Sequence, residues 1–298
     1  MSDVITGFAR TEDGEQLYYR QLGSQGPVIA CCNGVGVSTF FWKYVSLRFR
    51  DRYRVILWDY RGHGLSTVPR DPGAADLSIE RNARDLFCVL DALHVAEPVI
   101  LMGHSMGCQV ILEAWHQQPD RVRALVPMFG TAGRPLDTLL HVSFSKTLVR
   151  GLARVTERLG RSAYRLLLPL YASPVTLSFS RLTGLVDRYY AARVDMDHYL
   201  DHLQHMDPLV FLRMLDQMGD HDLWGALGGI HVPTLVFGGE NDLFTPLHCS
   251  ERMAADIPGA ELTVLAEGSH AAIVEHPETI NLRLERFLAD RVRAASPS

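Results

Sequence analysis

The sequence predicts an α/β protein with a mostly parallel, doubly wound sheet that is interrupted by one inserted helical segment. Short continuous apolar runs indicate buried strands, and they alternate with longer amphipathic patterns that indicate helices. After residue 130 this alternation stops, and strand patterns resume only at residue 233. Because sites in doubly wound sheets lie at the carboxyl ends of strands, the residues that follow each apolar run are the candidates for function.

The expected elements follow this pattern in order along the chain. Residues 4–22 alternate loosely around Asp13-Gly14, which indicates a β-hairpin. The runs that indicate strands are 27–32, 53–58, 98–102, 122–129, 233–237 and 261–265, of which 27–32 and 122–129 indicate buried strands. The patterns that indicate helices are 41–49, 79–93, 106–118 and 278–292. Ser78 is a suitable N-cap for the second of these helices, and Pro119 is expected to end the third.

The inserted segment divides the chain into two expected domains. Residues 133–220 lack the strand-helix alternation and are rich in Leu, Arg, Tyr and His, so we expect a helical cap there. Residues 1–132 and 221–298 would then form one core domain around the sheet. A chain of 298 residues, of which 47% are hydrophobic, is large enough for this arrangement.

Composition and charge argue against several other classes of protein. The net charge of −5 provides no electrostatic footprint for nucleic acid. The five cysteines show no paired spacing, so we expect no disulfide framework and a reducing, cytoplasmic location. We expect no signal peptide at the N-terminus, and the most apolar stretch, 166–177, is interrupted by prolines and too short to span a bilayer.

The segment Gly103-His-Ser-Met-Gly107 follows an apolar run and precedes a helical pattern, which predicts a strand, a sharp turn and a helix with Ser105 at the apex. Small residues on both sides, Gly103 and Gly107, allow such a turn to close. The turn would lift the Ser105 hydroxyl clear of the sheet. It would also place the N–H of Met106 at a helix N-terminus, where a developing oxyanion could bind.

A serine nucleophile needs a base, and the base needs an acid that orients it. The expected base is His270, which follows the last predicted strand, and the expected acid is Asp242, in a turn-rich loop after the preceding strand. The order Ser105, Asp242, His270 is the order expected of hydrolases with a serine on such a turn. Glu240, two residues from Asp242, and Asp222, which no strand precedes, are alternative acids.

The loop that follows the 27–32 strand is expected to complete the oxyanion hole. Val35 is the expected second N–H donor, beside Met106. The residues expected to contact substrate are Asn33, Gly34, Trp42 and His104. Trp42 could equally belong to the core of the helix that follows the loop.

With these motifs the chain resembles the α/β-hydrolase superfamily, and within it the capped serine esterases and lipase-like enzymes. The segments that carry the resemblance are Asp59-Tyr-Arg-Gly-His-Gly-Leu-Ser66, Gly103-His-Ser-Met-Gly107, Gly239-Glu-Asn-Asp242 with Pro246, and Gly268-Ser-His270. The resemblance implies an eight-stranded sheet with a helical cap, no cofactor, and a monomer or homodimer. It implies hydrolysis of small to medium apolar carboxylic esters through an acyl-enzyme on Ser105.

The sequence departs from the family pattern at two positions. Asn33 stands where members usually carry His, which leaves the shape of the oxyanion hole open. Cys108 stands where many members carry a second Gly, which should alter helix-strand packing and not chemistry.

Other activities on the same fold stay open. A C–C bond hydrolase or a lactonase would use the same triad, and a slow-turnover protein would act by binding its ligand. Similar C–C hydrolases usually have Asn before the nucleophile, where this chain has His104. Members that dehalogenate or open epoxides carry Asp at the apex, so Ser105 argues against both.

Three further features have more than one interpretation. The histidines on one face of an expected helix could bind zinc, but no third ligand is evident and interleaved aspartates indicate a solvated face, so no metal site is expected; they are His198, His202 and His205. Basic residues at every fourth position would form a solvated face or a weak contact with an anionic surface; they are Lys146, Arg150, Arg154 and Arg158. His63 is expected to tie loops together rather than to act as a second base.

Overall fold

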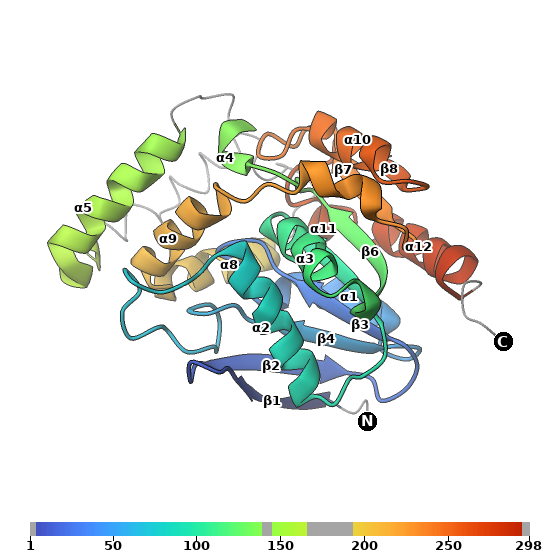
Figure 1. Ribbon diagram of the computed structural model, residues 1–298, viewed down its shortest axis with the longest axis horizontal. Helices are drawn as coiled ribbons and strands as arrows, with labels where there is room; N and C mark the ends of the chain where they lie inside the picture. Colours follow the sequence, from blue (N-terminus) through green and yellow to red (C-terminus); the bar gives the residue numbers. More distant parts are fainter. Residues whose placement is uncertain (1–3, 139–144, 166–192, 294–298) are drawn as a thin grey trace.

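The computed structural model describes residues 4–138, 145–165 and 193–293 (Figure 1). Its centre is an eight-stranded sheet with the order β1-β2-β4-β3-β5-β6-β7-β8. Only β2 pairs antiparallel with its neighbours, β1 and β4, and the remaining pairs are parallel. The strands are β1 (Val4–Arg10), β2 (Gln16–Leu22), β3 (Val28–Cys32), β4 (Arg54–Trp58), β5 (Val99–His104), β6 (Val122–Met128), β7 (Leu235–Gly239) and β8 (Glu261–Leu265). The predicted eight-stranded, mostly parallel sheet is confirmed.

Helices cover both faces of the sheet, which explains why the central strands are continuous apolar runs. Every residue of β3 and β5 is buried. Along β3, Ala30 faces a core shared with α2 and α3, and Ile29 and Cys31 face a core shared with α1 and α12. The helices of these layers are α1 (Lys43–Phe49), α2 (Ile79–Ala92), α3 (Met106–Gln117), α10 (Leu247–Asp256), α11 (Ala272–Glu275) and α12 (Pro277–Phe287). Alternation along each strand therefore fills two cores at once.

Short helical turns complete the core, and two sequence signals for helix ends are confirmed. The Ser78 hydroxyl accepts a hydrogen bond from the Arg81 N–H at the start of α2. Pro119 begins a new turn directly after α3. The turns are η1 (Thr39–Trp42), η2 (Pro119–Arg121), η4 (Trp224–Gly229) and the π-helical η5 (Leu288–Arg293).

Helices are the main elements of the segment between β6 and β7, in the part of it that the structure describes. Its helices are α4 (Pro135–Thr138), α5 (Ser145–Arg165), α8 (Arg193–His205) and α9 (Pro208–Met218). Figure 1 shows α5 at one end of the molecule and α9 between α5 and the sheet. Asp207 caps α9, because its carboxylate accepts the Leu209 N–H at 2.9 Å. The apolar stretch at 166–177 lies outside the described residues.

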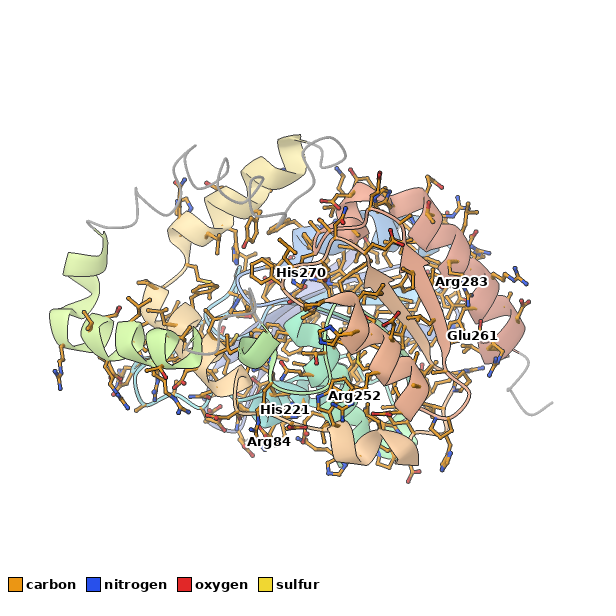
Figure 2. All side chains as sticks on the ribbon, turned by 90° about the horizontal axis from the view of Figure 1, so that it is seen from above. Arg84, His221, Arg252, Glu261, His270 and Arg283 are labelled. Atoms are coloured by element: carbon orange, nitrogen blue, oxygen red, sulfur yellow. The ribbon has the colours of Figure 1, made fainter. Side chains whose placement is uncertain are left out.

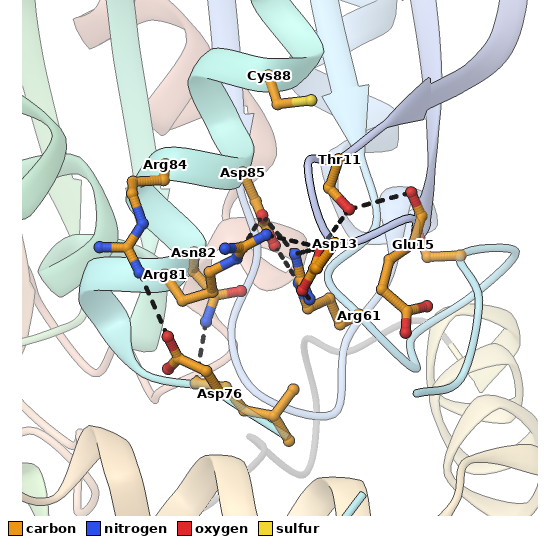
Figure 3. A network of polar contacts seen from close by, with 12 residues as sticks. Thr11, Asp13, Glu15, Arg61, Asp76, Arg81, Asn82, Arg84, Asp85 and Cys88 are labelled. Atoms are coloured by element: carbon orange, nitrogen blue, oxygen red, sulfur yellow. Dashed lines mark hydrogen bonds and ion pairs between the residues drawn. The ribbon is translucent and has the colours of Figure 1, made fainter. Parts of the chain in front are cut away.

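A buried ion-pair network joins the N-terminal hairpin to α2 and to the loop after β4 (Figure 3). Arg61 donates to Asp85 at 2.6 Å and to Asp13 at 2.6 Å, and Arg81 donates to the same two carboxylates. The side chains of Arg61 and Asp85 are only 3% and 1% exposed. Removing one partner of a buried pair leaves an uncompensated charge and costs about 3–5 kcal/mol. The network therefore fixes the start of the loop that runs from Asp59 to Ser66.

Arg150, from the basic stripe, forms ion pairs with acidic residues of the same chain at the surface. It donates to Asp216 and Asp220 of the α9 region, both at 2.7 Å, whereas Arg154 and Arg158 are exposed. The side chain of Lys146 lies outside the described part. In the described chain, no group of three or more His, Cys, Asp or Glu side chains is arranged to hold a metal ion. No helix within those same ranges has the length and apolar character needed to cross a membrane.

Candidate active site

The turn between β5 and α3 holds Ser105 in a left-handed backbone conformation, with φ of 56° and ψ of −118°. Such a conformation is strained for a residue with a side chain. A Cβ added at Gly103 would lie 2.2 Å from the Gly107 carbonyl oxygen, and one at Gly107 would lie 2.2 Å from the Cys32 carbonyl oxygen. The Ser105 N–H donates to the Met128 carbonyl at 3.1 Å. Only glycines permit this close packing, which holds the strained serine in place.

Three side chains that are distant in sequence form one chain of hydrogen bonds. His270 Nε2 lies 2.9 Å from Ser105 Oγ, and His270 Nδ1 lies 2.9 Å from Asp242 Oδ2. Figure 2 shows His270 near the middle of the molecule. Each residue follows a different strand of the sheet: Ser105 follows β5, Asp242 follows β7 and His270 follows β8. The structure thus brings together the three residues that the sequence singles out, in a geometry that can pass a proton from Ser105 to His270.

Asp242 is 2% exposed and accepts several hydrogen bonds. Its carboxylate accepts the backbone N–H groups of Phe244 and Thr245, both at 2.9 Å, and the Thr245 hydroxyl at 2.9 Å. Burial alone would raise the pKa of the Asp242 carboxyl. The charge of His270 and the hydrogen bonds from His270 and Thr245 outweigh burial, so this pKa lies below its usual value. Asp242 is therefore ionised where it meets His270.

The two alternative acids lie elsewhere. Glu240 is exposed, and its carboxylate accepts the Glu267 N–H at 3.4 Å. Asp222 is exposed and accepts the Trp224 N–H at 3.1 Å. Only Asp242, of the three carboxylates considered, contacts the imidazole of His270.

Ser269 and Glu275 support the His270 loop, and the sequence did not single them out. The Ser269 hydroxyl donates to the buried Glu275 carboxylate, with distances of 2.7 and 2.8 Å to its two oxygens. The same hydroxyl accepts the Ala271 N–H at 3.0 Å. The Asn241 N–H donates to the Gly268 carbonyl at 3.0 Å, which joins the loops after β7 and β8. No recognised sequence pattern relates Ser269 to Glu275.

Asn33 and Trp42, two of the residues predicted to contact substrate, lie buried inside the fold, and their contact with substrate stays a prediction. Asn33 is 1% exposed, and Trp42 is fully buried. The Asn33 amide donates to the Trp58 carbonyl at 2.7 Å, and its oxygen accepts the Trp42 indole N–H at 2.9 Å. The Tyr60 hydroxyl donates to the Asn33 carbonyl at 2.8 Å. Every polar group of the Asn33 side chain is thus used to hold the loop, and Trp42 belongs to the core.

The next residues of this loop are held from the segment after β4. His63 Nε2 accepts the Gly36 N–H at 3.0 Å, and His63 Nδ1 donates to the Arg61 carbonyl at 3.1 Å. Asp59 accepts the Thr39 N–H at 3.1 Å. Burial lowers the pKa of His63 to about 3, so the ring is neutral and can accept at Nε2. The prediction that His63 ties loops together is confirmed.

The same loop passes directly against Ser105. A Cβ added at Gly34 would lie 3.2 Å from Ser105 Cβ and 3.1 Å from His104 Nδ1. Gly34 therefore allows the backbone before Val35 to approach Ser105 closely. Met106, on the other side, is the first residue of α3. The backbone N–H groups of Val35 and Met106 stay predicted oxyanion donors.

His104 contacts the His270 loop, and its predicted contact with substrate stays a prediction. His104 is 2% exposed, and its Nε2 donates to the His270 carbonyl at 2.9 Å. Its ring centroid lies 5.2 Å from that of His270 and 4.7 Å from that of Phe41. Burial and the charge of His270 lower the pKa of His104 to about 3. The neutral, buried ring of His104 thus lies between the turn that carries Ser105 and the candidate base His270.

Comparison with known proteins agrees with this architecture. Residues 27–277 match the family model described as alpha/beta hydrolase fold. This chain belongs to the α/β-hydrolase fold family.

Named relatives of this α/β-hydrolase catalyse different hydrolytic reactions. The chain is 30% identical to a 2-hydroxy-6-oxononadienedioate/2-hydroxy-6-oxononatrienedioate hydrolase of Paraburkholderia xenovorans, over 95% of this chain and 94% of the relative. It is 27% identical to a putative carbamate hydrolase of Caulobacter segnis, over 88% of this chain and 91% of the relative. A solved hydrolase from Pseudomonas aeruginosa has 26% identity and a TM-score of 0.75, covering 95% of this chain and 98% of that one. The protein is therefore a hydrolase, and the bond that it cleaves is not fixed by these relatives.

In this α/β-hydrolase, Cys108 stands at the position where many members carry a second glycine and bonds to both neighbouring strand ends. Its thiol donates to the Gly103 carbonyl at 3.2 Å and accepts the Met128 N–H at 3.2 Å. A Cβ added at Gly130 would lie 2.4 Å from Cys108 Sγ. Burial raises the pKa of the Cys108 thiol, so it stays protonated. The Cys108 side chain thus packs between the start of α3 and the ends of β5 and β6, and its predicted lack of effect on the chemistry stays a prediction.

Apolar and aromatic side chains from the insertion lie over the loop at Gly36. A Cβ added at Gly36 would lie 2.9 Å from the ring of Phe211 and 3.0 Å from Leu203. The ring centroids of Phe40 and His202 lie 6.0 Å apart. The sequence alone does not identify Leu203, because a helical pattern does not show which face of α8 meets the core.

Proposed function

We propose that the chain is a serine hydrolase that cleaves small to medium apolar carboxylic esters. The observation that carries the proposal is the unbroken hydrogen-bond chain from Ser105 through His270 to Asp242, with Ser105 on a strained turn. In the proposal Ser105 is the nucleophile, His270 the general base and acid, and Asp242 the residue that orients His270.

The proposed reaction proceeds through an acyl-enzyme. Ser105 Oγ attacks the ester carbonyl while His270 Nε2 takes its proton, and the N–H groups of Val35 and Met106 stabilise the oxyanion. The intermediate collapses as His270 returns the proton to the departing alcohol, which leaves the acyl group on Ser105. Water then attacks the acyl carbon with His270 as base, which releases the acid and restores Ser105. Asp242 accepts the Nδ1–H throughout and stabilises the imidazolium.

The apolar preference rests on the described side chains near the triad. The Phe244 ring centroid lies 5.0 Å from that of His270. Phe211 and Leu203 approach the loop that carries Val35. We infer that residues 133–220 act as a cap that covers the acyl group, with an apolar lining of the kind that ligand pockets use.

Hydrolysis of p-nitrophenyl acetate, butyrate and octanoate tests the proposal. We expect sustained turnover by the wild type and a loss of at least about 10³-fold in kcat for Ser105→Ala. Ser78→Ala, which alters the cap of α2 and lies outside the triad, is the matched control and should keep the activity. A burst without turnover would indicate a ligand-binding protein, and activity that survives in Ser105→Ala would rule out this nucleophile.

A C–C bond hydrolase is the second candidate. It is favoured by the 30% identity to a relative whose name states hydrolysis of a 2-hydroxy-6-oxo dienedioate. The test measures turnover of a 2-hydroxy-6-oxo dienoate, which is monitored through the loss of its absorbance. This rate is compared with the rates for the three esters under the same conditions. If the dienoate is cleaved by the wild type and the esters are not, the second candidate replaces the first.

A further inference from the structure

The candidate base and the candidate nucleophile lie on strands that do not pair with each other. Ser105 follows β5 and His270 follows β8, with β6 and β7 between them in the sheet. The ladder between β6 and β7 has the single pair Met128 and Phe237 within the named strands. The spacing of nucleophile and base therefore depends on contacts between the loops.

Two consecutive residues at the turn between β5 and α3 form hydrogen bonds to two different atoms of His270. His104 Nε2 lies 2.9 Å from the His270 carbonyl oxygen, and Ser105 Oγ lies 2.9 Å from His270 Nε2. The hydrogen bond from His104 holds the backbone of His270, and the hydrogen bond from Ser105 is made to the ring nitrogen that takes the proton. Together they fix both the position of the loop and the reach of the ring.

The hydrogen bond also fixes the tautomer of His104. A carbonyl only accepts, so Nε2 carries the proton and Nδ1 has the lone pair. Nδ1 is buried and has no hydrogen-bond partner in the described part of the chain. An unpartnered buried nitrogen is unfavourable for stability, so packing alone does not explain a histidine here. A neutral donor also adds no positive charge beside a base that must itself become positive.

We propose that His104 is a positioning residue that holds the His270 loop at reaction distance from Ser105 through the Nε2–H···O=C bond. The inference rests on the proposed roles of Ser105 and His270. It does not depend on whether the natural substrate is an ester or a dione.

The test uses a fluorophosphonate probe, which reports activation of Ser105 without reference to the natural acyl group. Ser105 Oγ attacks phosphorus, fluoride leaves, and His270 takes the hydroxyl proton, so one equivalent of fluoride is released for each labelled serine. His104→Phe keeps a ring and removes the donor, whereas His104→Gln retains an N–H donor of similar reach. We expect His104→Phe to slow labelling by about 10- to 100-fold and His104→Gln to restore it to within about fivefold of wild type.

Ester turnover supplies a second measurement where it is present. A positioning defect should lower kcat by a similar factor and leave KM within about threefold of wild type, because acyl binding is not changed. The matched control is His221→Gln, another buried histidine, which contacts Glu113 and lies outside the triad. It should label at the wild-type rate even if its Tm falls.

The possible outcomes separate this inference from the proposed function. If His104→Phe is labelled at the same rate as wild type, the positioning role is overturned. It is also overturned if His104→Gln is labelled as slowly as His104→Phe. If the labelling rates fall in the expected order, wild type and His104→Gln faster than His104→Phe, but the wild type cleaves no ester, the positioning role of His104 is supported and the esterase proposal is rejected. If the wild type is not labelled at Ser105, both fail.

Discussion

The two sides of Ser105 are held in different ways. On the side of the predicted oxyanion hole, here called the oxyanion side, the loop from Asn33 to Thr39 is anchored mainly by groups from residues 58–63, a separate strand and loop. On the base side, Asp242 is anchored by its near neighbours Phe244 and Thr245, and Ser269 is anchored by Glu275.

This difference separates stability from chemistry. Anchors from another strand are part of the buried core, so a change on the oxyanion side should affect both folding and catalysis. On the base side the anchors of Asp242 and Ser269 come from residues close in sequence. The longer-range bonds of that side join the loops around the site rather than the strands of the core, so a change there should affect catalysis first. Substitutions on the two sides can test this contrast.

The largest effect is expected from Asp242→Asn. The amide keeps the shape of the side chain but removes the charge that holds the His270 Nδ1–H, so kcat should fall by about 10³- to 10⁴-fold. The free energy of unfolding should change much less than the activation free energy, because a change on the base side is expected to affect catalysis more than folding. The measurement is ester turnover together with urea unfolding.

Glu240→Gln is the matched control for this substitution, because Glu240 is a nearby carboxylate that does not contact His270. It should retain kcat within about twofold. If Glu240→Gln loses as much activity as Asp242→Asn, the orienting acid has been assigned wrongly.

Asn33→Ala tests the oxyanion side. It would leave the Trp42 indole N–H and the Trp58 carbonyl without their partner, and each unsatisfied buried group costs about 1–3 kcal/mol. Turnover should fall by about 10²-fold at the same time, since the loop that carries Val35 loses its anchor. Thermal unfolding and ester kinetics measured on one preparation would check both. A full loss of activity with unchanged Tm would contradict the contrast.

The sequence predicted the base side of the site better than the oxyanion side, for a physical reason. Ser105, Asp242 and His270 each follow a strand of the parallel part of the sheet, and a parallel sheet brings such positions to one edge. The roles of Asn33 and Trp42 depend on which strand lies beside β3, and β4 brings Trp58 to Asn33 only through the fold. The sequence did not predict the bonds that Asn33 makes inside the fold, because a polar residue at a strand end can face the core as well as the site.

The pH dependence of stability provides a third test, through His63. Its pKa is about 3 in the folded protein against 6.5 for the free side chain, so the unfolded chain binds the extra proton between these values. Stability is therefore lost as pH falls below 6.5, by up to about 1.4 kcal/mol per pH unit for this group, and is unaffected above. His63→Gln can still accept from Gly36 and donate to Arg61. Urea unfolding measured between pH 7 and 4 gives the slope of the free energy of unfolding against pH. For the variant this slope should correspond to about one proton fewer taken up on unfolding than for wild type. Equal slopes would contradict a buried, neutral His63 ring.

The smallest effect is expected from Thr245→Val. The variant removes the hydroxyl that donates to Asp242 Oδ2 but keeps the Thr245 N–H that donates to Oδ1. Since one of several local anchors is lost, kcat should fall only about three- to tenfold. The Tm should stay within about 2 °C of wild type, because a single exchanged bond at the loop changes little of the core. A large drop in Tm with unchanged kcat would show that Thr245 supports the fold rather than the carboxylate, and the contrast between the two sides would then fail on the base side.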